Sequence, residues 1–135
     1  MASGEDLPEN VKAVIADCGY TSEWDEFQRE ADTLHIPWFP VLNATSVLSK
    51  VRDGYDFKQA SALAQVKKSR IPTLFIHGSS DELVPYSMLG ELYAAAACEK
   101  EELTVEGAGH ALSSSVAPTL YWRTVEDFIA KYLDR

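Results

Sequence analysis

Two loop segments of this chain carry residues that can perform acid–base chemistry together. Asp81 lies within Ile76–Pro85, and His110 ends the segment Glu106–His110. Each segment follows a short apolar run typical of a buried strand, so both residues are expected at the carboxyl ends of parallel strands, where α/β sheets build their sites. A carboxylate bonded to one imidazole nitrogen orients the ring for proton transfer at the other nitrogen. Asp81 and His110 are therefore the candidate acid and histidine of a Ser-Asp-His triad.

The nucleophile of such a triad is missing from these residues. No Gly-x-Ser-x-Gly occurs in the sequence, although this pattern exposes the serine at a strand-to-helix elbow. Other serines lack that elbow and favour capping or turn roles: Ser22, Ser79, Ser80 and Ser113–Ser115. We expect the chain by itself to be inactive as a hydrolase.

Short apolar runs predict the strands that position the two residues. They are Val11–Gly19, which is rich in β-branched residues, Thr73–Ile76 and Leu103–Val105. Helical patterns separate them, and this alternation predicts an α/β fold with a parallel sheet and right-handed crossovers. We expect three layers, α/β/α. Three strands make a small sheet, which suggests that part of a larger sheet is missing.

A helical insert is expected at about residues 21–70. Ser22 and Asp25 form a start that resembles a capping box. Apolar residues then follow at helical spacing, namely Trp24, Phe27, Ala31 and Leu34. Pro37 and Pro40 interrupt the pattern, and further helices are predicted at about Val41–Val51, ending at Gly54, and around Ser61–Lys67.

Two more helices follow, and the first residues suggest the end of an earlier one. The segment Ser87–Ala97 is predicted to bury Met88, Leu89, Leu92, Tyr93 and Ala96. The last helix opens at Pro118 and is predicted to bury Trp122, Val125, Phe128, Ile129 and Tyr132. Residues 1–4 resemble the final turn of a helix that stops at Gly4.

Composition restricts the classes of partner. The 135 residues suit one small domain. The 21 acidic residues outnumber the 12 basic ones, giving a net charge of -9, which argues against nucleic acids and anionic membranes. Cys18 and Cys98 are expected as free, buried thiols in apolar surroundings, as in a reducing cytosol. No membrane-spanning run, signal peptide, metal-ligand spacing or phosphate loop is present, so we expect a cytoplasmic location and neither metal nor cofactor.

The two motif segments together resemble one enzyme family. Pro72–Pro85 and Gly107–His110, in this order and at this spacing, are similar to the C-terminal half of α/β-hydrolase fold serine hydrolases, such as bacterial esterases and serine aminopeptidases. The resemblance runs from about Val11 to Leu133. It implies strands six to eight of that fold, with Asp81 after the seventh and His110 after the eighth. The serine elbow and the oxyanion hole would precede Met1, and the substrate would be a small ester or a peptide.

The same resemblance assigns a role to the helical insert. Insertions after the sixth strand form a lid in this fold, and four aromatic residues could line an apolar substrate site: Trp24, Phe27, Trp38 and Phe39. The alternative is that they pack the insert onto the sheet. His77 is expected to shape the loop that follows its strand, and His35 is expected at the surface near a helix end.

Three functions stay open at this point. The leading one is the C-terminal portion of a serine hydrolase that cleaves ester or amide bonds. The second is a non-catalytic interaction module with the same fold, and the third is a dehalogenase-like or haloperoxidase-like hydrolase with another elbow residue. Without a fifth strand, the edge of Val11–Cys18 would be unpaired, and we expect a second copy or other residues to cover it. We also expect extra apolar surface to be exposed or self-associated.

Overall fold

The computed structural model describes residues 7–57 and 59–133, so the predicted helix end at residues 1–4 lies outside the described residues. A parallel sheet stands at its centre, with the strand order β1-β2-β3. The strands are β1 (Val14–Asp17), β2 (Thr73–Gly78) and β3 (Lys100–Val105). All three predicted strands are confirmed, but β1 is shorter than expected, whereas β2 continues through His77 and Gly78 and β3 begins earlier.

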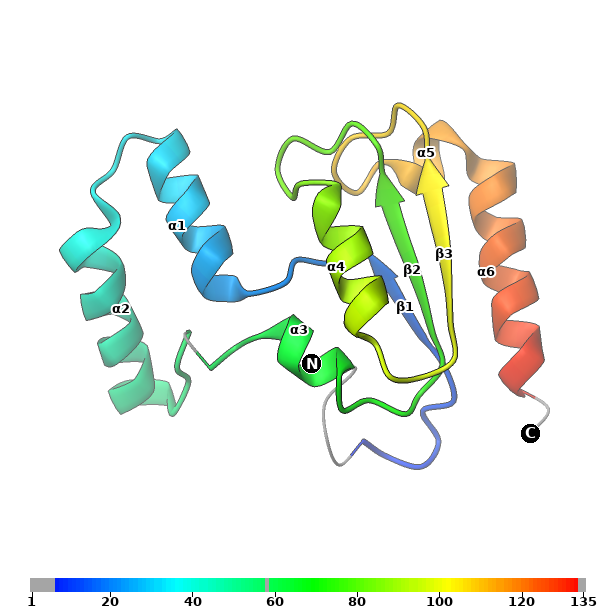
Figure 1. The fold of residues 1–135 in the computed structure, drawn as a ribbon, viewed down its shortest axis with the longest axis horizontal. Coiled ribbons are helices and arrows are strands. Elements are labelled where there is room, and N and C mark those ends of the chain that lie inside the picture. The colour runs from blue at the N-terminus through cyan, green and yellow to red at the C-terminus, as the bar shows by residue number, and fades with distance from the viewer. Residues whose placement is uncertain (1–6, 58, 134–135) are drawn as a thin grey trace.

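Helices cover both faces of this sheet (Figure 1). They are α1 (Glu23–Thr33), α2 (Trp38–Asp53), α3 (Ala62–Val66), α4 (Ser87–Ala95), α5 (Ser113–Val116) and α6 (Pro118–Leu133). All but the short α5 were predicted. The three-layer α/β/α arrangement is confirmed.

The central strand explains why the layers hold together. Every residue of β2 is buried, and its side chains alternate between two cores. Leu74 and Ile76 pack with Phe128 of α6, whereas Phe75 packs with Leu89 of α4 on the other face. Burial on both sides is why this segment is a continuous apolar run rather than an alternating one.

Local capping signals place the helix ends as predicted. The Ser22 hydroxyl accepts a hydrogen bond from the Asp25 N–H (3.1 Å) at the start of α1. Gly54 ends α2 with a left-handed φ of 71°, a conformation that glycine adopts without steric cost. Phe39 is not helical, so the regular part of α2 begins at Pro40, and proline suits a first helical turn.

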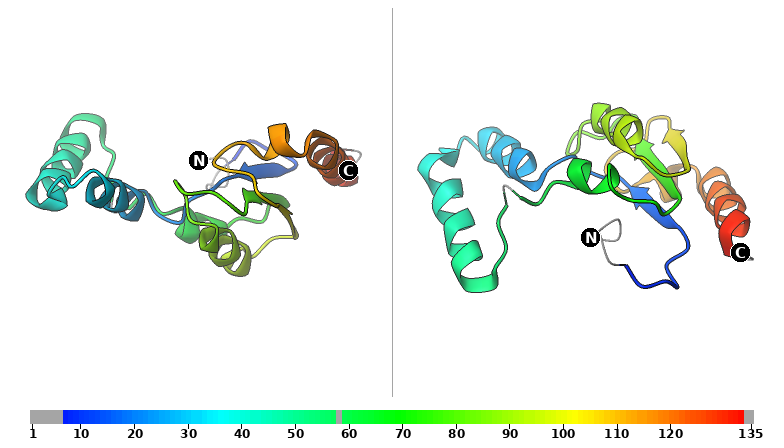
Figure 2. Two further views of the ribbon diagram at one scale, coloured as in Figure 1. Left: turned by 90° about the horizontal axis from the view of Figure 1, so that it is seen from above. Right: turned by 60° about the horizontal axis from the view of Figure 1, so that its bottom comes forward.

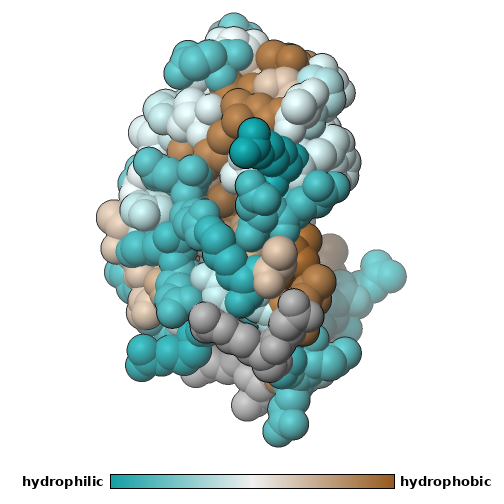
Figure 3. Space-filling model, turned by 90° about the vertical axis from the view of Figure 1, so that its right-hand side faces the viewer, coloured by the Kyte–Doolittle hydropathy of each residue, from teal (hydrophilic) through white to brown (hydrophobic). Residues whose placement is uncertain are grey.

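The buried stripe of α6 differs by one residue from the prediction. Trp122 is 55% exposed, whereas Tyr121 is buried and packs with Val125 and Phe128. One position on a helix turns the side chain by about 100°, so Tyr121 and Trp122 cannot both face the sheet. Figure 3 views this side and shows apolar residues between polar ones. Exposed apolar side chains in and near α5 and α6 include Leu112, Val116, Leu120 and Trp122.

The first two helices of the insert pack against each other to one side of the sheet (Figures 1 and 2). Ser46 is the buried residue of α2, and several apolar side chains of that helix are exposed: Val41, Val47, Leu48 and Val51. The expected exposed apolar surface is therefore present in the insert as well as beside α6. No described helix has the length and apolar character needed to cross a membrane.

The first strand lies at an edge of the sheet. Among the described residues, β1 pairs with β2 on one side, and no strand pairs with its other side. The predicted open edge is therefore present, and its pairing with a second copy stays a prediction.

Candidate active site

The loops that follow β2 and β3 lie against each other. A Cβ atom added at Gly78 would stand 2.2 Å from the Ala108 carbonyl oxygen, so the two backbones approach closer than any side chain allows. The Ser80 N–H donates to that same carbonyl oxygen (3.0 Å). The Ser79 hydroxyl donates to Glu106 (3.0 Å) and accepts from the Gly107 N–H (2.9 Å). These contacts hold the two candidate segments at one edge of the sheet.

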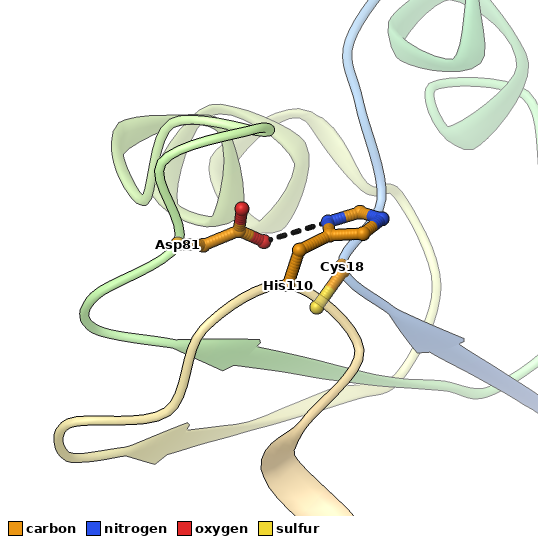
Figure 4. Close-up of side chains that lie close together, drawn as sticks. All are labelled: Cys18, Asp81 and His110. Carbon is orange, nitrogen blue, oxygen red and sulfur yellow. Dashed lines mark hydrogen bonds and ion pairs between the residues drawn. The ribbon is translucent and has the colours of Figure 1, made fainter.

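The structure brings Asp81 and His110 together across these loops. The Asp81 side chain is fully buried, and its Oδ2 accepts a hydrogen bond from His110 Nδ1 at 2.9 Å. Figure 4 shows the second ring nitrogen of His110 pointing away from Asp81. The imidazole is 37% exposed, so this nitrogen is placed to meet a reacting group. The predicted contact between Asp81 and His110 is therefore present in the structure.

The other oxygen of Asp81 is held by the backbone. Asp81 Oδ1 accepts hydrogen bonds from the N–H groups of Leu83 (3.0 Å) and Val84 (2.8 Å). Burial by itself raises the pKa of the Asp81 carboxyl, but the hydrogen bonds from Val84 and His110 outweigh it and hold the pKa below its ordinary value. Asp81 is therefore ionised and fixed in orientation at neutral pH.

The other two histidines occupy the positions expected of them. His77 is fully buried at the end of β2, where its Nε2 lies 3.0 Å from the Val84 carbonyl oxygen and 3.3 Å from Asp81 Oδ2. These contacts connect the end of β2 to the loop that carries Asp81. His35 is exposed just after α1, with a φ of 55°.

Cys18 is the residue at this site that the sequence interpretation missed. It follows β1 with a φ of 52°, and its Sγ accepts a hydrogen bond from the Ala111 N–H (3.2 Å). The thiol also donates to Asp17 Oδ1 (3.3 Å). The ligand atoms of Cys18, Asp81 and His110 all lie within 4.8 Å of one another (Figure 4). The expectation of apolar surroundings was therefore wrong for Cys18, whose thiol has polar partners in the neighbouring Asp17 and the distant Ala111.

The environment of Cys18 keeps it a thiol. Burial is the largest influence and raises the pKa of the Cys18 thiol to about 11, although the hydrogen bond from Ala111 acts in the opposite direction. Cys18 is 6% exposed, and Cys98 is half-buried rather than buried as predicted. Both cysteines are free.

Glu26 of α1 is a partly buried carboxyl beside Arg29. Burial raises the pKa of the Glu26 carboxyl, and the charges of Arg29 and, more weakly, His110 oppose that rise. Glu26 and Arg29 form an ion pair on α1.

The four aromatic residues proposed for the substrate site divide into two groups. Phe27 and Trp38 line an apolar groove of about 290 Å³ between α1 and α2, and Phe57, which the sequence interpretation did not include, also lines it. The rings of Phe27 and Phe57 lie 5.1 Å apart. Trp24 and Phe39 do not line this groove, and Phe39 is 66% exposed. The role of all four in substrate binding stays a prediction.

Comparison with known proteins assigns the family. The sequence matches the prolyl oligopeptidase family over residues 1–135. The chain belongs to this family. One curated relative is the uncharacterized protein YqkD of Bacillus subtilis (strain 168). Its sequence is 29% identical to that of this chain over 132 residues. The match covers 96% of this chain and 43% of YqkD.

Solved structures place this family member in the α/β-hydrolase fold. The Pyrococcus furiosus esterase PF2001 superposes with a TM-score of 0.70 at 18% identity, covering 98% of this chain and 48% of the esterase. Rv0554 of Mycobacterium tuberculosis superposes with a TM-score of 0.62 at 16% identity, and the match covers 94% of this chain and 59% of Rv0554. An alpha/beta fold family hydrolase of Bacillus anthracis str. Sterne also superposes with a TM-score of 0.62, at 12% identity, and the match covers 94% of this chain and 61% of that hydrolase. The chain therefore spans about half the length of the proteins it matches.

Proposed function

We propose that this chain supplies the acid and the histidine of a serine hydrolase that cleaves ester or amide bonds. The observation that carries the proposal is the 2.9 Å contact between Asp81 Oδ2 and His110 Nδ1. Membership of a hydrolase family and likeness to the fold of solved hydrolases support it. The substrate would be a small ester or a peptide.

Each residue of the pair has a distinct role in this proposal. Asp81, held by two backbone N–H groups, fixes His110 in the tautomer whose Nδ1 carries the proton. The other ring nitrogen then takes the proton of a serine hydroxyl as that oxygen attacks the carbonyl carbon. It returns the proton to the leaving group when the acyl bond breaks. Such proton transfer contributes about 10²–10⁴-fold to a rate.

The serine and the oxyanion hole would come from residues outside this sequence. No Gly-x-Ser-x-Gly occurs in the 135 residues, so the chain alone is expected to lack turnover. In the complete hydrolase, the groove lined by Phe27, Trp38 and Phe57 would receive the apolar part of the substrate.

The test compares two proteins. One is the 135-residue chain, and the other is the product of the same gene with the coding sequence that precedes Met1. We expect that upstream sequence to encode Gly-x-Ser-x-Gly and the longer product to hydrolyse p-nitrophenyl acetate. His110→Ala should lower its kcat by about 10³-fold or more. His35→Ala is the matched control, because this histidine is exposed and should leave kcat unchanged.

Three outcomes would contradict parts of the proposal. If the longer product lacks both the serine motif and turnover, the chain is an interaction module that uses the fold without its chemistry. If the 135-residue chain itself turns over ester and loses this activity with His110→Ala, the nucleophile lies within the chain. An activity that is unchanged by His110→Ala would remove the proposed role of the pair.

A further inference from the structure

Three side chains with different metal-binding atoms meet at the carboxyl edge of the sheet. Cys18 follows β1, Asp81 lies in the loop after β2, and His110 lies in the loop after β3 (Figure 4). Their sulfur, oxygen and nitrogen atoms lie within 4.8 Å of one another. Thiolate, carboxylate and imidazole are the ligands that zinc uses in proteins.

The separations are close to those of a metal site. Zinc–ligand bonds of about 2.0–2.3 Å in a tetrahedral arrangement place ligand atoms about 3.3–3.8 Å apart. Atoms within 4.8 Å of one another therefore need to shift by about 1.5 Å at most. Asp81 Oδ2 and His110 Nδ1 are already 2.9 Å apart, so the larger movement belongs to the sulfur or the imidazole.

The three side chains are oriented by neighbouring groups, and one of them is open to solvent. Asp81 is oriented by the N–H groups of Leu83 and Val84, in the manner of the outer contacts that support metal ligands. Cys18 and Ala111 both have left-handed backbone conformations without being glycine, with φ values of 52° and 56°. Such conformations concentrate at functional sites. The His110 imidazole is 37% exposed, which leaves a path for an ion and a fourth position for water.

We propose that Cys18, Asp81 and His110 bind a thiophilic divalent cation such as Zn²⁺ or Cd²⁺, and that the bound ion switches the Asp81–His110 pair off. The ion would bind the Cys18 thiolate, one Asp81 oxygen and His110 Nδ1. The thiol proton goes to solvent, and the Nδ1 proton is replaced by one on the other ring nitrogen. That nitrogen then has no lone pair to accept a proton. Metal binding does not depend on the proposed hydrolase function, whereas the inhibition does.

The test is metal binding to the 135-residue chain, kept reduced and stripped of metal. Zn²⁺ should bind at one ion per chain in calorimetry, and Mg²⁺ should show no binding, because it prefers oxygen ligands. Co²⁺ should produce a thiolate-to-cobalt charge-transfer band in the near ultraviolet. Cys18→Ser should remove this band and weaken Zn²⁺ binding at least tenfold.

Cys98→Ser is the matched control. Cys98 contacts Thr73 at the opposite end of β2, so its substitution should leave both the band and the zinc affinity unchanged. If Cys18→Ser fails to fold by circular dichroism, His110→Ala decides, because this partly exposed ligand can be removed without leaving a core cavity. The site is overturned if Zn²⁺ does not bind, if the band survives Cys18→Ser, or if it disappears with Cys98→Ser.

Discussion

Gly78 controls how closely the two loops of the candidate site can approach. In Gly78→Ala, the new Cβ would lie 2.2 Å from the Ala108 carbonyl oxygen and 2.7 Å from its carbonyl carbon. The two backbones must then separate by about 1 Å, and overpacking of this kind costs about 1–3 kcal/mol. The hydrogen bond from the Ser80 N–H to Ala108 is strained or lost, which costs about 1 kcal/mol. Alanine also lowers the conformational entropy of the unfolded chain, which stabilises the folded state by about 0.4–1 kcal/mol and offsets part of this loss.

We therefore expect Gly78→Ala to lower the free energy of unfolding by about 1–3.5 kcal/mol. The measurement is equilibrium urea denaturation. Gly90→Ala is the control, because Gly90 lies within α4 and a Cβ there would meet nothing within 4 Å. Alanine in a helix interior should raise the free energy of unfolding by about 0.5–1 kcal/mol.

The folded Gly78→Ala variant should also weaken the Asp81–His110 hydrogen bond. The resonance of the His110 Nδ1 proton, held by a carboxylate, reports this bond in proton NMR. A Gly78→Ala variant as stable as the wild type, with an unchanged resonance, would refute the conclusion that the close approach of Gly78 and Ala108 holds the pair together.

Three further expectations follow from single contacts. Burial and a hydrogen bond to Asp17 raise the pKa of Tyr121 to about 12 from 10.0, so the folded state keeps the phenol neutral. Its contribution to stability is complete below pH 10 and falls as the pH rises toward 12. The loss is about 1.4 kcal/mol by pH 11 and should be absent from Tyr121→Phe in urea denaturation; an equal loss in both proteins would contradict this. In the native chain, iodoacetamide should modify Cys98 before Cys18, because Cys18 is 6% exposed and its pKa is about 11. Peptide mass spectrometry measures the order of modification, and modification of Cys18 first would contradict this expectation. The open edge of β1 should pair two chains, and a strictly monomeric sedimentation profile at high concentration would count against that pairing.

Contacts between near neighbours in the sequence were predictable. Ser22 caps α1 and Gly54 ends α2, because each signal acts within one helical turn. The meeting of Asp81 and His110 was also predictable, since parallel strands bring their carboxyl ends to one edge.

Contacts that depend on packing were not predictable in the same way. Cys18 joins the site through Ala111, which is 93 residues away in the sequence, and no local pattern records that hydrogen bond. The sequence has aromatic residues at both 121 and 122, and the contacts that place Tyr121 against the sheet, such as its hydrogen bond to Asp17, come from distant segments. The helical spacing of apolar residues in α2 indicated a helix but not a buried face, because a periodic pattern does not tell what covers it.

The connection between α4 and β3 lies at the end of the sheet away from the candidate site. Lys100, the first residue of β3, pairs with Thr73, the first residue of β2. Asp81 and His110 lie beyond the last residues of these strands. Residues inserted between α4 and β3 would therefore lie a whole strand length from the acid and the histidine. We expect an affinity tag or label at this end of the sheet to leave the contact between Asp81 and His110 intact.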